Sequence, residues 1–275
     1  MIVSLFLIAA SLPSIVNEAP AGAVKLLRPG TRSGQVQDAS SSRAPWVDAN
    51  GWRYRRNAHP QFLYDGVPAK WLPLAAAEAF VYGGPAVIRT DAEGRAALDP
   101  MMQFLKGIAD KSLNPVADIF VYDDGSPALG EVLNLLSRRN LAFETGAQPE
   151  GNYKLVVKVG TPEFPQVATA NPSQFAYLVR KKLGDPKRSL RIFGSEIIIG
   201  YLTAEGGKAR LHLLNYGTDP IESFRVRVLG NWKVAGIRSF QDGTLKADEE
   251  AIVDGGVEFG VPKITTYAVV DLTRK

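Results

Sequence analysis

The chain has 275 residues, 45% of them hydrophobic and 22% charged, which is the composition of an ordinary globular protein. The formal net charge of +4 comes from scattered basic residues, which argues against a nucleic-acid-binding protein, because such proteins cluster them. With no cysteine and only two histidines, the chain can form neither disulfides nor a cysteine or histidine-rich metal site, so we expect no metal and no cofactor. The two short basic runs, at 53–56 and 179–188, are typical of solvated faces.

The N-terminus carries an apolar run that is too short to span a bilayer, which needs about 20 residues. The small residues of "AGA" at 21–23 then offer a cleavage site, and we interpret residues 1–23 as a secretory signal peptide. No Lys or Arg precedes the run, so a buried N-terminal segment or a misassigned start codon is the alternative. The expected mature chain is secreted or periplasmic, has no membrane span, and begins with a flexible lead-in over 24–44.

Between residues 45 and 185 the pattern alternates helix and strand. A helix is expected at 71–84, and three more after pairs of a capping residue and proline. These pairs are Asp99–Pro100, Ser126–Pro127 and Asn171–Pro172. Short apolar strands are expected at 86–90, 117–122, 141–144 and 153–160. The alternation predicts a Rossmann-like or flavodoxin-like three-layer αβα domain over 45–185.

After residue 186 the hydrophobic period changes to two. Strands are expected at 195–202 and 208–217, joined by a hairpin turn, and at 224–230, 257–262 and 265–272. In "FRVRVLG" the apolar residues share one face, while Arg225 and Arg227 lie on the other. The sequence therefore predicts a small antiparallel β-sandwich over 186–275, giving an α/β plus all-β protein.

The αβ unit together with "ARLHLLNYG" and "VPKITTYAVVDL" resembles the C-terminal portion of secreted bacterial glycoside hydrolases over about residues 71–272. The αβ part is similar to the glutamine-amidotransferase-like trimerisation domain of some β-galactosidases. The resemblance implies a carbohydrate-related and largely non-catalytic role, because the catalytic carboxylates of such enzymes sit on a separate barrel that needs about 250 residues. It also implies no amidotransferase activity, since that reaction uses a cysteine and the chain has none.

Paired carboxylates follow one predicted strand, in "VYDDGSP". Asp123 and Asp124 lie where open α/β sheets bind ligands, and two carboxylates could take a hard cation. The same residues also suit a tight turn that starts a helix. Paired aspartates at a strand end also resemble the acidic, Mg²⁺-binding pocket of response-regulator receiver domains. Such a pocket requires a further aspartate at the end of a later strand, and the segment "YKLVVKVGTPEF" has none at its end, so this site is excluded. We favour the turn.

The segment "WVDANGWRYRRN" is the most distinctive candidate for sugar binding. Trp46 and Trp52 lie close in sequence to Asp48, Asn50 and Arg53, and aromatic planes beside polar groups are typical of sugar clefts. The alternative is that both tryptophans anchor the segment against the αβ core.

Glycosidase chemistry needs two carboxyl groups about 5–10 Å apart, and the sequence gives no distances. Glu78 is notable as the lone charge of an apolar helix, where burial would raise its pKa. His59 is a weaker candidate base, and His212 is expected to be a packing or surface residue. The catalytic candidates are Asp48, Asp65, Glu78, Asp123, Asp124 and Glu196.

Three functions stay open from the sequence. The leading hypothesis is an exported, non-catalytic accessory protein that binds a glycan or a protein partner. The second is a small glycoside hydrolase that uses carboxylates at Asp48 or Asp65 and at Asp123 or Asp124. The third is a structural module that associates with copies of itself.

Overall fold

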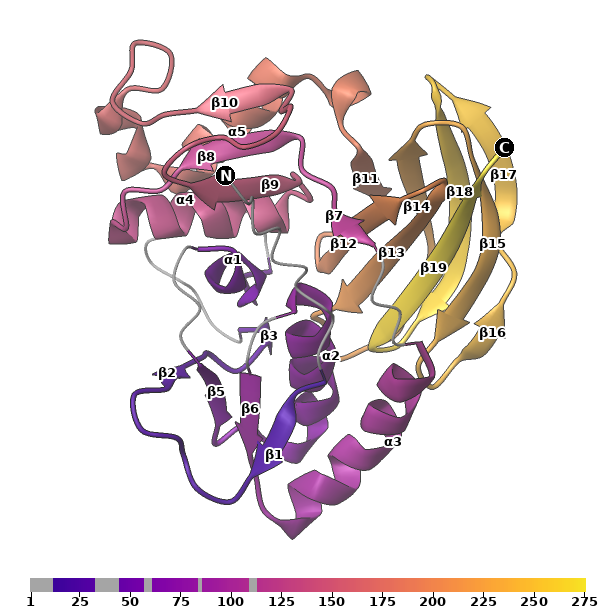
Figure 1. Cartoon of the computed structure of the whole chain (residues 1–275). Coiled ribbons are helices and arrows are strands. Elements are labelled where there is room, and N and C mark those ends of the chain that lie inside the picture. The colour runs from indigo at the N-terminus through magenta and orange to yellow at the C-terminus, as the bar shows by residue number, and fades with distance from the viewer. Residues whose placement is uncertain (1–11, 33–44, 57–60, 84–85, 109–112) are drawn as a thin grey trace.

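The computed structural model describes residues 12–32, 45–56, 61–83, 86–108 and 113–275. Figure 1 shows a β-sandwich packed beside two αβ units, with the short helix α1 (Gly51–Tyr54) between the two units. This arrangement agrees with the predicted combination of an α/β part and a terminal all-β part.

The first αβ unit is built on a parallel sheet in the order β1-β6-β5-β2. The strands are β1 (Ser14–Val16), β2 (Val24–Lys25), β5 (Phe62–Asp65) and β6 (Ala86–Arg89). A 3-10 turn, η2 (Ala69–Trp71), leads into α2 (Leu72–Tyr82), which packs with α3 (Ala92–Ile108) in one hydrophobic core with the sheet. Tyr64 and Ile88 point into that core and are fully buried.

The ends of these two helices follow local rules. Gly83 ends α2 in the left-handed conformation, with φ 65°, as the predicted glycine stop requires. α3 differs from the prediction, because Pro100 lies inside the helix and does not start it. The chain is already helical from Ala92, after Asp91, whose carboxylate accepts a hydrogen bond from the amide of Gly94 at 2.9 Å. The capping residue is therefore Asp91 and not Asp99.

The second αβ unit is a parallel sheet in the order β10-β8-β9. Its strands are β8 (Ile119–Tyr122), β9 (Phe143–Gly146) and β10 (Leu155–Val157). The predicted caps of α4 (Pro127–Arg138) and α5 (Pro172–Leu183) are confirmed, since Ser126 and Asn171 each accept a hydrogen bond from the amide three residues later. Two 3-10 turns flank α5, namely η3 (Gln166–Ala170) and η4 (Asp185–Lys187).

The expected single three-layer domain over 45–185 is thus corrected to two separate parallel sheets. The division comes after α3, where the chain crosses to the sandwich before it returns to β8. There β7 (Asn114–Pro115) pairs antiparallel with β12 (Ile198–Glu205), and β6 and β8 belong to different sheets.

The β-sandwich is formed by two antiparallel sheets. One has the order β11-β14-β18-β17 and the other β16-β15-β19-β13-β12-β7. Alternate residues of both sheets fill the core between them, as the period of two predicts. The remaining strands are β11 (Leu190–Phe193), β13 (Lys208–Asn215), β14 (Ile221–Leu229), β15 (Trp232–Ser239), β16 (Gly243–Leu245), β17 (Asp248–Val253), β18 (Gly256–Ile264) and β19 (Tyr267–Arg274).

One polar side chain on the outer face of the sandwich is buried. Arg227 lies on the face of β14 opposite the core residues Phe224, Val226 and Val228, as the alternation predicts, yet only 1% of it is exposed. Its guanidinium donates hydrogen bonds to the carbonyls of Val253 and Asp254 at the end of β17. A neighbouring strand end therefore covers this arginine and satisfies part of its hydrogen-bonding capacity.

The N-terminal region is more ordered than expected. β2 lies within the predicted flexible lead-in, as does β3 (Gly30–Thr31), which pairs with β4 (Val47–Asp48). β1 lies within the predicted signal peptide and pairs in parallel with β6. The flexible lead-in is corrected for residues 24–31, while residues 1–11 and 33–44 lie outside the described residues. No helix among the described residues is long and apolar enough to cross a membrane.

Candidate functional site

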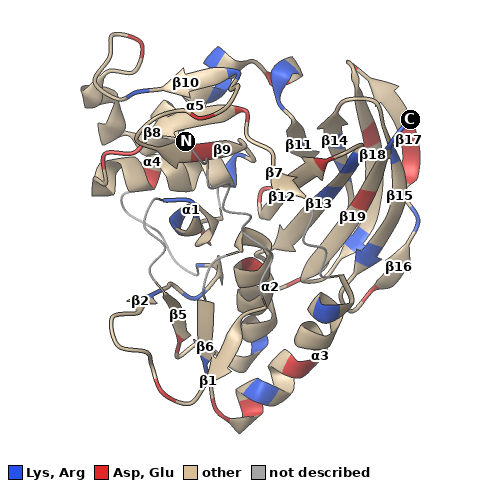
Figure 2. Ribbon diagram, in the orientation of Figure 1, with Lys and Arg blue, Asp and Glu red and all other residues tan. Residues whose placement is uncertain are grey.

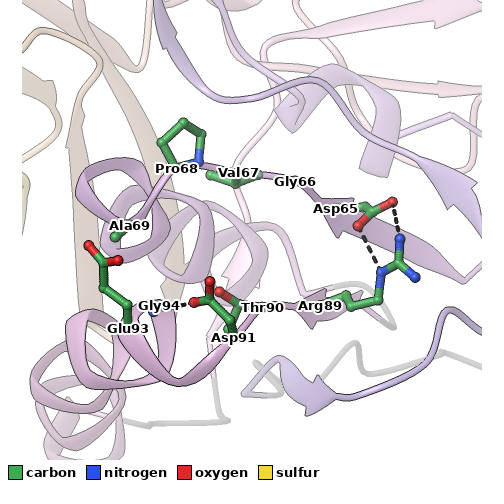
Figure 3. A pocket seen from close by; sticks show the side chains of 10 residues that line it. All are labelled: Asp65, Gly66, Val67, Pro68, Ala69, Arg89, Thr90, Asp91, Glu93 and Gly94. Atoms are coloured by element: carbon green, nitrogen blue, oxygen red, sulfur yellow. Dashed lines mark hydrogen bonds and ion pairs between the residues drawn. The ribbon is translucent and has the colours of Figure 1, made fainter.

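The candidate site is a hollow of about 480 Å³ at the carboxyl ends of β5 and β6, which we call the edge hollow. Its lining consists of residues 65–69, which begin with the last residue of β5, and of residues 89–91, 93 and 94, which begin with the last residue of β6 (Figure 3). Ligands bind open parallel sheets at the carboxyl ends of the strands, and two neighbouring strands both end here.

A fixed ion pair forms one wall of the edge hollow. Arg89 donates two hydrogen bonds to Asp65, each 2.8 Å long, and Lys25 adds a third at 3.3 Å. Asp65 and Arg89 lie directly opposite each other in the register of β5 and β6. The hydrogen bond from Arg89 lowers the pKa of Asp65, so this carboxylate stays ionised and acts as an acceptor.

The other wall carries Thr90, Asp91 and Glu93 at the start of α3 (Figure 3). Asp91 uses one carboxylate oxygen for the amide of Gly94. The side chain of Glu93 is exposed. The hollow thus presents carboxylates, a guanidinium and a hydroxyl, which are groups that orient a polar ligand by hydrogen bonds.

Glu78 does not belong to this hollow, although the sequence singled it out as a catalytic candidate. It is fully buried on α2 and accepts four hydrogen bonds. Asn50 donates its backbone and side-chain N–H groups at 2.6 and 2.9 Å, and the hydroxyls of Tyr64 and Tyr216 donate at 2.7 and 2.6 Å. Burial raises the pKa of Glu78, yet all four bonds tie it to the protein, so its role here is structural.

The aromatic segment predicted to bind sugar is used inside the molecule. Trp52 is 6% exposed and packs in the core of the second αβ unit, and the guanidinium of Arg53 lies 4.2 Å from its ring centroid. Trp46 is half-buried, and the Arg138 guanidinium lies 4.5 Å from its ring centroid. Asn50 is fully buried against Glu78. The structure therefore places these residues according to the anchoring alternative.

The segment 50–56 around α1 connects three parts of the molecule, and we call it the α1 junction. Asn50 reaches α2, and Arg55 donates a hydrogen bond to the carbonyl of Phe143 on β9. The ring centroid of Tyr201, on the sandwich strand β12, lies 4.6 Å from the Arg55 guanidinium. Arg56 reaches β8 as described next, so this short segment contacts both αβ units and the sandwich.

The paired aspartates after β8 form a turn closed by an ion pair. Arg56 donates to both carboxylate oxygens of Asp123, at 2.9 and 2.6 Å, and this guanidinium lowers the pKa of Asp123. Asp123 also accepts a hydrogen bond from the amide of Gly125, and Asp124 accepts one from the amide of Ser126. Both carboxylates thus serve the turn that precedes α4, as the favoured interpretation expected.

The remaining candidates lie apart from the edge hollow. Asp48 accepts a hydrogen bond from Arg32 at 2.6 Å and one from the indole of Trp46 at 3.2 Å. His212 is buried, which lowers its pKa to about 3, and its Nδ1 lies 2.7 Å from the hydroxyl of Tyr267. Glu196 lies beside a second hollow described below, and His59 is outside the described residues. Among the described residues, no group of three or more His, Asp or Glu side chains is arranged to hold a metal ion.

Sequence reasoning missed Arg89, Asp91 and Glu93. The signal was present, because the strand at 86–90 was predicted and is followed directly by charged residues in "IRTDAE". The sequence does not show that β5 and β6 are neighbouring strands. This pairing brings Arg89 and the residues after it beside Asp65.

The fold is similar to known structures, although no protein-family profile and no curated protein sequence matches the chain. Alpha-L-fucosidase isoenzyme 2 from Paenibacillus thiaminolyticus matches 92% of this chain at 10% identity, with a TM-score of 0.58. A GH42 β-galactosidase from G. stearothermophilus matches 82% of the chain at 10% identity, with a TM-score of 0.49. The chain spans 65% and 56% of these two proteins, respectively. The chain has a glycoside-hydrolase-like fold.

Proposed function

We propose that this chain is a non-catalytic, glycan-binding protein of carbohydrate metabolism and that the glycan binds in the edge hollow. The observation that carries the proposal is the position of this polar hollow, at the carboxyl ends of two parallel strands in a glycoside-hydrolase-like fold. The amidotransferase-like relationship of the αβ part remains a prediction from sequence.

The edge hollow has the size and the chemistry for a short glycan. Its volume of about 480 Å³ falls within the range of small-molecule sites, which is about 300–1,000 Å³. The pair of Asp65 and Arg89 offers a fixed acceptor beside a fixed donor, and two adjacent sugar hydroxyls can use both at once. Because the ion pair holds both groups in place before binding, little side-chain freedom is lost when a ligand arrives.

Neither Asp65 nor Glu78 has the properties of a glycosidase proton donor. A glycosidase uses a carboxylic acid with a raised pKa as proton donor, within reach of the substrate. In the edge hollow the pKa of Asp65 is lowered by Arg89. The pKa of Glu78 is raised, but this group is completely buried and bonded to Asn50, Tyr64 and Tyr216.

A small glycoside hydrolase is the second candidate, because three carboxylate residues line the same hollow. They are Asp65, Asp91 and Glu93. In this alternative the exposed Glu93 is the proton donor, and Asp48, Asp123 and Asp124, which the sequence suggested as partners, take no part.

One experiment separates the two candidates. A panel of neutral oligosaccharides is titrated into the full chain by calorimetry, and reducing-end release from the same compounds is followed in parallel. We expect binding without release, and loss of binding in Arg89→Ala but not in Arg225→Ala, which removes a similarly exposed arginine from ion pairs on the sandwich. Absence of binding by every compound contradicts the proposal, whereas sugar release that disappears in Glu93→Gln establishes the hydrolase.

Export remains part of the proposal and rests on the N-terminal sequence. The relevant measurement is the N-terminal sequence of the protein recovered from the periplasm of a bacterial host. A start at Val24 supports a cleaved signal peptide and implies that β1, with Ser14–Val16, is removed from the sheet. Recovery of the intact chain from the cytoplasm contradicts export.

A protein partner or self-association is supported by the exposed edge of the sandwich. β17 is an edge strand, exposed along its length, and its Ile252 is 52% exposed. Edge strands with free N–H and C=O groups can pair with another chain. Sedimentation at micromolar concentration tests this, and a monomer contradicts self-association.

A further inference from the structure

A second hollow of about 480 Å³ lies between the αβ part and the sandwich, where four arginines meet. We call it the arginine hollow. Arg139 follows α4, Arg180 lies on α5, Arg188 follows η4 and Arg191 lies on β11. Figure 2 shows the corresponding blue ribbon at the end of α5 and on the segment that leads into β11. The sequence suggested only a solvated face for the run 179–188.

The carboxylates nearby neutralise only part of this charge. Asp185 accepts two hydrogen bonds from Arg180, at 2.9 and 2.6 Å, and one from Arg188 at 3.1 Å. It also lies 3.9 Å from Arg191. The hydrogen bonds from Arg180 and Arg188 hold the pKa of Asp185 far below its usual range. Glu196 is the other carboxylate of the lining. Four guanidinium groups thus face two carboxylates, which leaves a positive excess in the hollow.

The buried arginine of this cluster has a donor without an acceptor. Arg188 is 5% exposed, and its Nη2 donates to the carbonyls of Arg139 and Asn140. Its Nε, which is buried, has no hydrogen-bond partner within the described part of the chain. A buried donor of this kind costs free energy unless a ligand or water satisfies it. Burial also lowers the pKa of Arg188, which indicates that the surrounding carboxylates do not fully offset its desolvation.

An exposed aromatic ring lies one turn from the hollow. Tyr177 is 51% exposed and precedes Arg180 by three residues on α5, so the two side chains share a face of the helix. In the lining of the hollow, Arg191 lies over the ring of Phe193, with 4.6 Å between the guanidinium carbon and the ring centroid. Aromatic faces beside charged donors suit a ring-shaped ligand that carries an anion.

We propose that the arginine hollow binds an acidic sugar unit, whose sulfate or carboxylate group accepts hydrogen bonds from Arg188 and Arg191 while its ring packs on Tyr177. The anion part rests on the arginines alone, and the sugar part rests on the proposed carbohydrate function. Arginine forks match planar carboxylates and tetrahedral oxyanions, and such charge-assisted bonds are stronger than neutral ones.

The test is a calorimetric titration of the full chain at low ionic strength. The probes are inorganic sulfate, a chondroitin sulfate tetrasaccharide, its desulfated form, and neutral cellotetraose. We expect the acidic tetrasaccharides to bind at least tenfold more tightly than cellotetraose, and the affinity to fall as sodium chloride screens the charges. Tighter binding of the sulfated form assigns the anion as a sulfate ester, and equal binding of both acidic forms assigns it as the uronate.

Variants locate the site. Arg191→Ala should weaken binding of the acidic tetrasaccharide about tenfold, which corresponds to the loss of one charge-assisted hydrogen bond. Tyr177→Ala should weaken the tetrasaccharide but not inorganic sulfate. Arg274→Ala is the matched control, because it removes another arginine that lies over an aromatic ring, 5.9 Å from Trp232 in the sandwich, and it should change nothing. The same titrations are repeated in Arg89→Ala, which removes binding in the edge hollow, so that the affinity that remains for the acidic tetrasaccharide reports the arginine hollow.

Several outcomes would overturn the proposal. They are the absence of binding by either acidic tetrasaccharide, binding of inorganic sulfate alone, and equal affinity for cellotetraose. Unchanged affinity in folded Arg191→Ala would also overturn it, as would tighter binding of a single-stranded 20-mer oligonucleotide than of the acidic tetrasaccharides. If neutral glycans fail to bind the edge hollow, the proposal for the arginine hollow can still be tested, because binding of the acidic tetrasaccharides is measured independently of binding of neutral glycans.

Discussion

In both parallel sheets an aspartate at the carboxyl end of a strand pairs with an arginine, but the two sheets differ in whether that strand end is covered. Asp65 ends β5 and Asp123 follows β8, and each is held by two hydrogen bonds from one arginine. In the first sheet the arginine is Arg89 of the neighbouring strand, which lies beside the aspartate and leaves the edge hollow open. In the second it is Arg56 of the α1 junction, which reaches across from another part of the chain and covers the turn. The position of the arginine therefore decides the outcome. An arginine on the neighbouring strand leaves the strand end open as a hollow, whereas an arginine from the α1 junction closes it as a turn.

The difference is also one of exposure. The side chains of Asp123 and Arg56 are 7% and 19% exposed, whereas those of Asp65 and Arg89 are 18% and 42% exposed. Removing one partner of a covered pair lowers stability, because it leaves a buried charge without a partner, whereas removing one partner of an exposed pair changes stability little. Stability measurements can therefore test the α1 junction, and binding measurements can test the edge hollow.

The largest effect is expected from Trp52→Ala. Trp52 fills the core between α1 and α4, so its removal should leave a cavity and reduce the free energy of unfolding by about 3–5 kcal/mol. Urea denaturation followed by circular dichroism measures this value. Trp46→Ala is the control and should cost less, since Trp46 is only half-buried. Equal and small effects of both changes would show that α1 does not anchor the second αβ unit.

Glu78→Ala should reduce the free energy of unfolding by about 3 kcal/mol, because it leaves buried donors of Asn50, Tyr64 and Tyr216 unsatisfied. The pKa of Glu78 is raised in the folded protein by burial. Its stability contribution is therefore complete below the unfolded pKa, about 4.3, and is lost as the pH rises through the folded pKa. The stability advantage of the wild type over Glu78→Gln should decrease over that interval, and an increase would contradict the assignment.

Arg56→Ala should cost about 1–2 kcal/mol, since it leaves Asp123 partly buried without its partner. Arg56 lowers the pKa of Asp123, so the stabilisation is present above the unfolded pKa, about 3.9. It is lost as the pH falls through the folded pKa. The difference between the wild type and Arg56→Ala should therefore shrink in acid, and a double-mutant cycle with Asp123→Ala gives the coupling energy. A coupling energy near zero would mean that the turn does not need the ion pair.

The smallest effect on stability is expected at the edge hollow. Arg89→Ala removes an exposed partner of Asp65 and should leave the urea midpoint unchanged within error, because such pairs are screened by water. The same variant should lose glycan binding, so the two readouts move independently. A large drop in the midpoint would show that the edge hollow is a structural element like the α1 junction.

Much of the architecture could be predicted from local signals. The caps at Ser126 and Asn171, the glycine stop after α2 and the period of two in the sandwich all depend on residues close in sequence. The candidate site could not be predicted in this way, because its residues come together only through the order of strands in the sheet, and local sequence patterns do not specify that order. The edge hollow exists because β6 lies beside β5, and Trp52 is buried because α4 packs on α1. Tryptophans near polar residues look alike in sequence whether they face a ligand or the core.

The four hydrogen bonds to Glu78 have a consequence for folding during synthesis. Their donors lie at residues 50, 64 and 216, so the last of them, the hydroxyl of Tyr216, is 138 residues away from the carboxylate. During synthesis the ribosome releases α2 long before β13 has been made. Until the sandwich emerges, the first αβ unit holds a buried acceptor that lacks its most distant donor. We therefore expect nascent chains that stop before Tyr216 to be more sensitive to protease than the finished protein.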